Sequence, residues 1–260
     1  DNANKLTNAL FYNSANGTAI TGSSFNTDTI ISSENNTRIS NLQVQATGLA
    51  SRALQSNNTA ITLDNMIFEA DNREAGSGGG AIALNWTAFV VRNCLIIQRA
   101  TVVNANSSIA NITGGGDLYS CSFVTTGAAP TYCFNNSTVT SRFTNCALYA
   151  NDSTKTIATG PTFLTFTTCY SDISGTTGVT QATYANQFVN VVDATRDFRN
   201  KSGANILDTG TADTVNSFID IVGTARPVGA ATDVGAWEGF VAAAGSVVPV
   251  LMAEYRRRWG

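Results

Sequence analysis

Histidine is absent from the 260 residues of this chain, so chemistry must come from carboxylates, cationic side chains or cysteines. A chain without histidine lacks the usual general base near neutral pH and the commonest metal ligand. Charged residues make up only 13% of the sequence, and the net charge is −3. This balance indicates neither nucleic acid nor an anionic membrane as a partner, and no cofactor is expected.

The five cysteines are Cys94, Cys121, Cys133, Cys146 and Cys169. No two of them form a Cys-x-x-Cys pair, so a tetrahedral metal site is not expected. Four recur at one position of a repeat, where a small apolar thiol packs well, and the odd total argues for free thiols. Reduced thiols suit a protein that folds in a cytoplasm, even one that later works outside the cell.

That repeat covers six stretches in one register, and its central polar positions recur every 23 to 28 residues. The central residues are Asn41, Asn65, Asn93, Ser120, Asn145 and Thr168. Two places earlier lie Ile39, Leu63, Val91, Leu118, Phe143 and Phe166. One place later lie Leu42, Met66 and four of the cysteines, and three places later lie Val44, Phe68, Ile96, Phe123, Leu148 and Ser171. Such a period is typical of solenoids, in which each unit buries its face against the next.

Alternation on both sides of the centre has the period of β-strands, and the centre breaks phase by one residue, as a tight bend would. About 25 residues rich in Thr, Asn, Ser and Gly cannot form the two helices that a helical repeat needs. The sequence therefore predicts an all-β fold, a single-stranded parallel β-helix. Central Asn amides about 4.8 Å apart are expected to form a hydrogen-bonded ladder.

Four regions follow from this register. Residues 1–36 form an N-terminal cap or degenerate coil, and residues 37–180 form the coils of the β-helix. Residues 181–240 form the last coils and a C-terminal cap, and residues 241–260 form a docking tail. Residues 70–81 and 99–116 are interpreted as long loops between coils.

Outward positions decide whether the coils can carry catalysis. Glu69 and Asp172 are acidic and outward, but four coils place them about 19 Å apart, too far for the paired carboxylates of glycoside hydrolysis. Asp117 and Arg142 form the sole lyase-like pair on neighbouring coils, and a surface ion pair is the favoured interpretation. No catalytic residue is therefore expected.

Apolar outward residues on successive coils point to a different role. They are Ile67, Leu95, Ile97, Val124, Ala147 and Tyr149. A contiguous apolar patch on a soluble solenoid marks a protein contact or a surface covered by a long loop. We expect a partner-binding surface, with covering by residues 99–116 as the alternative.

The end of the chain offers a second candidate contact. An apolar run from Val247 to Met252 precedes a basic, aromatic end. The run is too short to span a membrane, so an amphipathic docking peptide is the better interpretation. Its candidate partner-binding residues are Val250, Leu251, Tyr255, Arg256, Arg257 and Trp259.

Between residues 197 and 238 the chain carries an ordered series of motifs. They are Asp197-Phe198-Arg199, then residues 202–210 ending in Asp208-Thr209-Gly210, then residues 220–227 ending in Arg226-Pro227, then residues 233–238. This order resembles the C-terminal end of right-handed parallel β-helix repeat proteins, with Gly203 in place of the usual proline and with Val234 and Trp237 as mild departures. The resemblance implies a right-handed coil and a terminal cap, in proteins of tailed-phage particles and bacterial surfaces.

Within this motif the charged residues are expected to be structural. Arg226 is the natural partner of Asp233 or Glu238, and Trp237 is expected to lie over the last coil as a lid. A catalytic role for the two carboxylates is the alternative.

Together these features predict a non-enzymatic structural or attachment protein of a tailed-phage virion, such as a head decoration, fibre or tail appendage. Its partners would be other virion proteins or copies of itself, and it would fold in the host cytoplasm. One alternative is a spike that binds or cleaves polysaccharide, with a host surface glycan as its ligand. Another is a secreted bacterial adhesin, located outside the cell or on its surface.

Overall fold

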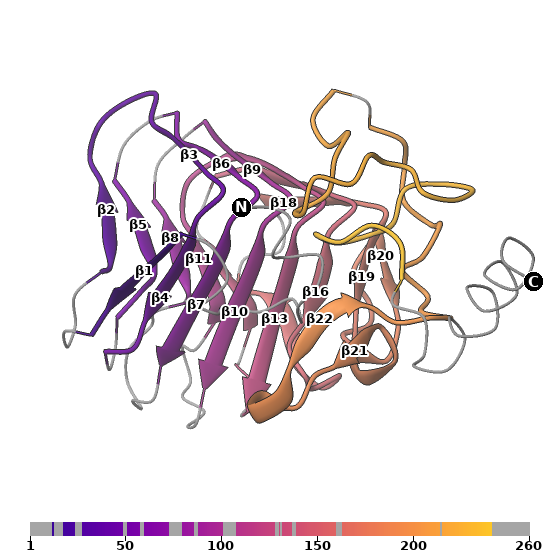
Figure 1. The fold of residues 1–260 in the computed structure, drawn as a ribbon. Coiled ribbons are helices and arrows are strands. Elements are labelled where there is room, and N and C mark those ends of the chain that lie inside the picture. The colour runs from indigo at the N-terminus through magenta and orange to yellow at the C-terminus, as the bar shows by residue number, and fades with distance from the viewer. Residues whose placement is uncertain are drawn as a thin grey trace, which may run out of the picture.

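The computed structural model describes residues 12, 18–23, 28–48, 51–57, 60–72, 80–85, 88–100, 108–127, 130, 132–136, 139–159, 163–213 and 215–240. Their strands recur in a fixed order through three parallel sheets, here called A, B and C, so the chain winds as a parallel β-helix (Figure 1). This confirms the predicted all-β, parallel β-helical fold.

Each sheet collects one strand from each successive coil. Sheet A holds β1 (Ala19–Gly22), β4 (Gln43–Ala46), β7 (Ile67–Asn72), β10 (Leu95–Ala100), β13 (Ser122–Gly127), β16 (Ala147–Tyr149), β19 (Cys169–Ser171) and β20 (Val179–Gln181). Sheet B holds β2 (Ile30–Ser32), β5 (Leu54–Ser56), β8 (Ile82–Leu84), β11 (Ser108–Ile112), β14 (Tyr132–Asn136) and β17 (Thr156–Ala158). Sheet C holds β3 (Arg38–Ser40), β6 (Thr62–Asp64), β9 (Phe89–Arg92), β12 (Gly116–Tyr119), β15 (Ser141–Thr144) and β18 (Leu164–Thr167).

After the last coil the chain forms less regular structure. Two short 3-10 helices, η2 (Tyr184–Asn186) and η3 (Asp193–Thr195), alternate with an antiparallel strand pair. The pair is β21 (Phe188–Asn190) and β22 (Asp197–Asn200).

Sheet B differs from the sequence-based prediction. Residues 99–116 were expected to be a loop, yet they contain β11, which pairs with β8 and β14. The strands of sheet B lie at different distances from the central position of each repeat, because the connections from sheet A vary in length. They therefore form no column when the repeats are aligned on that position.

The bend between sheets C and A explains the polar central column. All six central residues have φ between 49° and 60°, the left-handed region that asparagine tolerates better than most residues. The expected side-chain ladder is present between Asn65 and Asn41, where Asn65 Nδ2 donates to Asn41 Oδ1 over 3.3 Å. Asn93 and Asn145 instead bind the segment that follows the coils.

Inward columns of the three sheets form one continuous core that includes all five cysteines as free, buried thiols, and burial was predicted for Cys94, Cys121, Cys146 and Cys169. Burial raises the pKa of the Cys94, Cys121 and Cys146 thiols well above the usual range. The Cys94 thiol donates to the carbonyl of Arg92 over 3.1 Å, and Cys121 and Cys146 repeat this contact two residues back. A thiol at this column therefore both fills the core and satisfies a backbone carbonyl at the bend.

Candidate functional site

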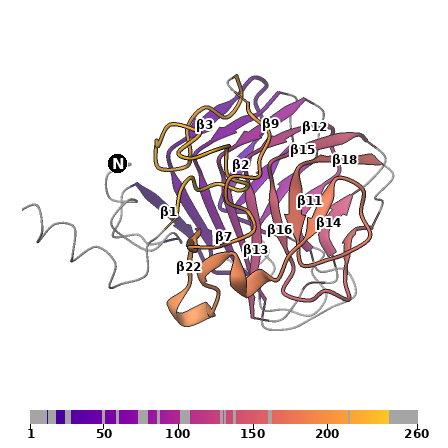
Figure 2. The ribbon, with the colours of Figure 1, turned by 90° about the vertical axis from the view of Figure 1, so that its right-hand side faces the viewer.

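Residues 184–240, called here the lateral cover, run back along the outer face of sheet A. Figures 1 and 2 show them as the orange-to-yellow part of the ribbon. The Tyr184 hydroxyl donates to the Thr125 carbonyl over 2.8 Å, and the Ala236 N–H donates to Ser122 Oγ over 3.0 Å. Both acceptors lie on or beside β13, several strands away from the C-terminal edge of sheet A. The segment thus covers the side of the β-helix.

The apolar patch predicted to be an exposed partner surface lies beneath this cover. Its members point outward from sheet A, as expected, but Ile67, Leu95, Ile97, Val124 and Tyr149 are at most 1% exposed. They form a second core cluster with apolar side chains of the lateral cover, among them Tyr184, Phe188, Phe198, Ile206 and Val234. The prediction of exposure was therefore wrong, and the covering segment is residues 184–240 rather than residues 99–116. The protein's own chain therefore buries this apolar face of sheet A.

Aromatic rings anchor this second cluster. The rings of Tyr149 and Tyr184 stack with centroids 5.2 Å apart and planes 15° apart. Phe188 meets both rings edge-on, and Phe198 continues the series at 5.6 Å from Phe188. Such pairs contribute beyond their buried area, so the cover is packed as a domain core rather than as a loose flap.

A charged cluster fastens the cover at its other side. Glu69 on β7 is fully buried and accepts hydrogen bonds from Arg196 at 2.8 and 2.9 Å. Arg99 on β10 forms a bidentate pair with Asp193, at 2.9 and 2.8 Å, and lies 3.6 Å from Glu69. The Arg99 guanidinium lowers the pKa of Asp193 to about 2. Glu69, expected to be an outward carboxylate, therefore serves to hold η3 against sheet A.

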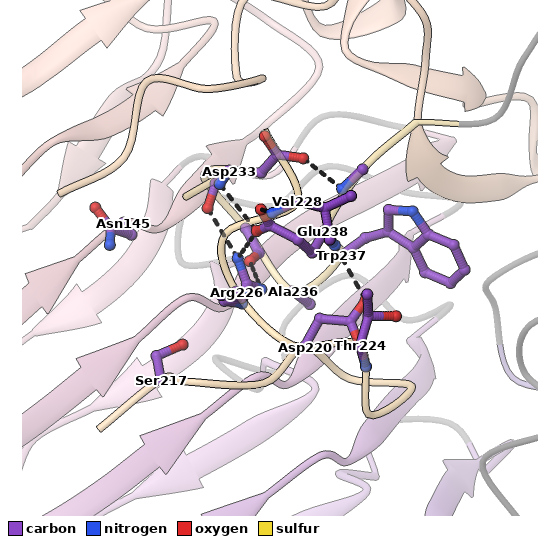
Figure 3. Close-up of polar contacts among 12 residues, drawn as sticks. Asn145, Ser217, Asp220, Thr224, Arg226, Val228, Asp233, Ala236, Trp237 and Glu238 are labelled. Carbon is purple, nitrogen blue, oxygen red and sulfur yellow. Dashed lines mark hydrogen bonds and ion pairs between the residues drawn. The ribbon is translucent and has the colours of Figure 1, made fainter. Parts of the chain in front are cut away.

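The motif between residues 220 and 238 forms a second, almost fully buried network (Figure 3). Arg226 Nη1 donates to Glu238 over 2.8 Å, which confirms one of the two predicted pairings. The same Nη1 also donates to the backbone carbonyl of Asp233, at 2.9 Å, rather than to its carboxylate. Desolvation lowers the pKa of Arg226, and the three nearby carboxylates oppose this shift.

In the same network the carboxylates accept hydrogen bonds from backbone N–H groups. Asp220 accepts from Val222 and Thr224, and Glu238 accepts from Val228 at 2.9 Å. Asp233 accepts from Asp208 and Gly239, both at 2.7 Å, while burial raises its pKa to about 6. The carboxylates therefore fix the turns of the cover, and this arrangement favours the structural interpretation over a catalytic pair.

Gly235 shows why the motif needs a glycine against the sheet. Its φ is 101°, and a Cβ there would lie 2.7 Å from Ser122 Oγ and 3.3 Å from the Ala147 side chain. Its N–H donates to the Asn145 carbonyl over 2.8 Å. Trp237, expected as a lid over the last coil, lies instead in the lateral cluster, with the Arg199 guanidinium 6.0 Å from its ring. The motif is thus a docking surface for sheet A.

On the outer face of sheet C, Asp117 and Arg142 form the predicted surface ion pair. Arg142 Nη2 donates to Asp117 Oδ2 over 2.9 Å, and the arginine side chain is 67% exposed. Asp172, the other outward acid of the sequence analysis, is buried and accepts the Ala150 N–H over 3.0 Å. Asp117 is therefore paired with a cation, and Asp172 is held by a backbone N–H.

A narrow cleft opens between the same sheet and residues 215–219 of the cover, called here the strap. Its lining includes Arg38, Asp64, Arg92, Asn216 and Phe218, and its volume is about 90 Å³. Ser217 fastens the strap by donating to Asn93 over 2.8 Å. Sequence reasoning missed this cleft, although Asp64 and Arg92 share the position just before the centre in successive repeats.

Several predicted features lie outside the described residues. They include the tail residues Val250, Leu251, Tyr255, Arg256, Arg257 and Trp259. Within the described ranges, no group of three or more acidic or cysteine side chains is placed to hold a metal ion. The same ranges contain no helix that is long and apolar enough to cross a membrane.

Comparisons with protein-family models, with curated proteins and with solved structures give no match.

Proposed function

We propose that this chain is a non-enzymatic structural or attachment protein built on a β-helix. The observation that carries the proposal is the use of its buried ionic groups. Glu69 pairs with Arg196 and joins the lateral cover to the coils, whereas Arg226 pairs with Glu238 and fixes the turns of the cover. This use of the buried ionic side chains supports a rigid scaffold, in which they maintain the shape of the protein.

The assembly we propose is a tailed-phage virion, with other virion proteins or copies of this chain as partners. The support is the resemblance of residues 197–238 to the C-terminal end of β-helix repeat proteins found in such particles. The tail of residues 241–260 remains the predicted docking segment. Because the apolar patch on sheet A is covered, it no longer serves as an argument for a partner.

Two measurements test this proposal. First, antibodies against the purified protein should label particles isolated from the source of the gene. A variant ending at residue 240 should fold, as judged by an unchanged melting temperature, and be lost from those particles. Second, the purified protein should leave acidic polysaccharides intact over long incubation. Depolymerisation that is lost in Asp117→Asn, or absence of the protein from every particle, would overturn the proposal.

A polysaccharide-binding spike is the second candidate function. The outer face of sheet C favours it, because half-buried and exposed hydroxyl and charged side chains follow one another in register along this face.

A further inference from the structure

Arg92, at the end of β9, is an arginine of the described coils whose side chain lacks a hydrogen-bond acceptor. Its side chain is only 28% exposed, and its nearest carboxylate oxygen is Asp64 Oδ1, 3.7 Å from Nε. That distance is too long for a hydrogen bond. Among the described residues the Arg92 guanidinium donates no hydrogen bond, and its Nε is buried without a partner. A buried N–H normally has an acceptor, and the Nε–H of Arg92 has none within hydrogen-bond distance among the described residues.

Asp64 is shared between the two arginines of the cleft, because its Oδ2 is bound by Arg38 and its Oδ1 faces Arg92 beyond hydrogen-bond distance. Arg38 Nε and Nη2 lie 2.9 and 2.8 Å from Asp64 Oδ2. The cleft therefore contains two guanidinium groups and one carboxylate, a formal charge of +1. Its volume of about 90 Å³ is small beside the roughly 300–1,000 Å³ of an ordinary ligand pocket. Such a space admits a carboxylate or a group of similar size, and not a whole cofactor.

The surroundings of the cleft extend this small site along the sheet. In register beyond Arg92 lie Tyr119, Thr144 and Thr167, one strand spacing of about 4.8 Å apart. On the opposite side the strap presents Phe218, which is 55% exposed. Hydroxyls that continue in register from Arg92, together with the aromatic side chain that lines the cleft, suit a sugar chain, which offers many hydroxyl groups and apolar C–H faces.

We propose that the cleft between the strap and sheet C binds the carboxylate of an acidic saccharide, with Arg92 as the anion-binding residue and Phe218 against the adjoining sugar ring. This inference concerns what the face binds, and it stands whether or not the protein belongs to a virion. A peptide is the weaker fit for two reasons. Strands β6 and β9, which carry Asp64 and Arg92, are paired on both sides, so no peptide strand can add there. The cleft also offers no deep apolar pocket for a side-chain anchor.

The probes are a galacturonate trisaccharide, a hyaluronan tetrasaccharide and N-acetylneuraminic acid. Binding to the full chain is measured by NMR titration and calorimetry. We expect at least one to bind, with its affinity falling as salt rises. Its methyl ester, which keeps every hydroxyl but loses the charge, should bind about tenfold or more weakly. Arg92→Gln should weaken binding by about 10- to 100-fold, in line with the loss of a charge-assisted hydrogen bond.

Arg142→Gln is the matched control, because Arg142 lies on the same face but is held by Asp117. It should leave the affinity unchanged, and Phe218→Ala should weaken binding without lowering the melting temperature. The inference is overturned if none of the acidic sugars binds at millimolar concentration, or if the methyl ester binds as tightly as the acid. It is also overturned if an Asp-rich peptide binds more tightly than every sugar, because the face would then be a protein-docking surface.

Discussion

Arg196 and Glu69 lie 127 positions apart in the chain, yet Nη2 of Arg196 donates to both carboxylate oxygens of Glu69, at 2.9 and 2.8 Å. Gln45 on the preceding strand donates to the same carboxylate over 2.9 Å. The pair therefore ties the part of the chain that follows the coils to strand β7, near the opposite end of sheet A. Long-range contacts of this kind make the coils and the cover one cooperative unit.

Glu69→Ala should lower the free energy of unfolding by about 3–5 kcal/mol, because it removes the carboxylate that Arg196 binds through Nη2 and leaves this largely buried cation with the more distant carboxylate of Asp193, at 3.7 Å. Urea denaturation measures the loss, and an apolar dye should bind the variant if the cover loosens. The control is Asp117→Asn, which breaks an exposed pair and should cost less than about 1 kcal/mol. Equal effects of the two substitutions would show that the Glu69 pair does not fasten the cover.

Leu95→Lys tests whether the outer face of sheet A is core. An exposed partner surface would tolerate this change, but Leu95 is fully buried beneath the cover. A lysine there must bury an unpaired charge or displace the cover, so we expect a loss of several kcal/mol or failure to fold. Thr165→Lys, at an exposed outward position of sheet C, should have little effect in the same thermal melt. A variant with native stability would mean that the cover is not packed in solution.

Repetition made most of the β-helix predictable from sequence. Columns such as Leu118 and Phe143 alternate in phase with the strands, and that alignment fixed which side chains point inward. It also placed Leu95 and Ile97 correctly on the outward face. The six polar residues at the bend were recognisable for the same reason, since one backbone conformation recurs in every coil.

The lateral cover could not be predicted in the same way, because its contacts follow no period. Phe188, Ile206 and Val234 are widely spaced in sequence, yet all three belong to the apolar cluster against sheet A. The only local sign was the motif containing Arg226 and Glu238, which indicated a cap without saying which face it covers. The cleft at Arg92 is formed in part by the strap, so the position of the cleft could not be predicted from the sequence either.

Ser120→Gly should stabilise the protein by up to about 1 kcal/mol. Ser120 has a φ of 49° and a buried hydroxyl that has no partner among the described residues. Glycine removes the left-handed strain and the unsatisfied oxygen, and these gains outweigh the greater entropy of the unfolded chain. Denaturant titration should show a higher midpoint with an unchanged slope.

Asn145→Gly is the matched comparison at the same bend position. It relieves similar strain but removes two side-chain contacts with Thr211, at 2.7 and 2.8 Å. We therefore expect Asn145→Gly to destabilise the protein. If Asn145→Gly stabilised the protein as much as Ser120→Gly, the side-chain contacts between Asn145 and Thr211 would contribute nothing.

Stability should also respond to pH through two aspartates with opposite shifts. Burial raises the pKa of Asp233 from 3.8 to about 6, whereas the Arg99 guanidinium lowers the pKa of Asp193 from 3.8 to about 2. Between pH 4 and 6 the folded state holds a proton on Asp233 that the unfolded state has released, so stability falls as pH rises through that window. The Asp193 contribution is complete above about pH 4 and is lost as pH falls toward 2.

We therefore expect a higher melting temperature at pH 4.5 than at pH 7, measured at constant ionic strength. Asp233→Asn should reduce this difference but not abolish it, because burial also raises the pKa of Asp220 and Asp172. Asp193→Asn should leave the difference intact and flatten the decline below pH 4, since it removes the carboxylate that pairs with Arg99. A melting temperature that rises from pH 4.5 to pH 7 would show that Asp233 is ionised at little cost in the folded protein, and that the network around Arg226 is more open to water than its burial implies.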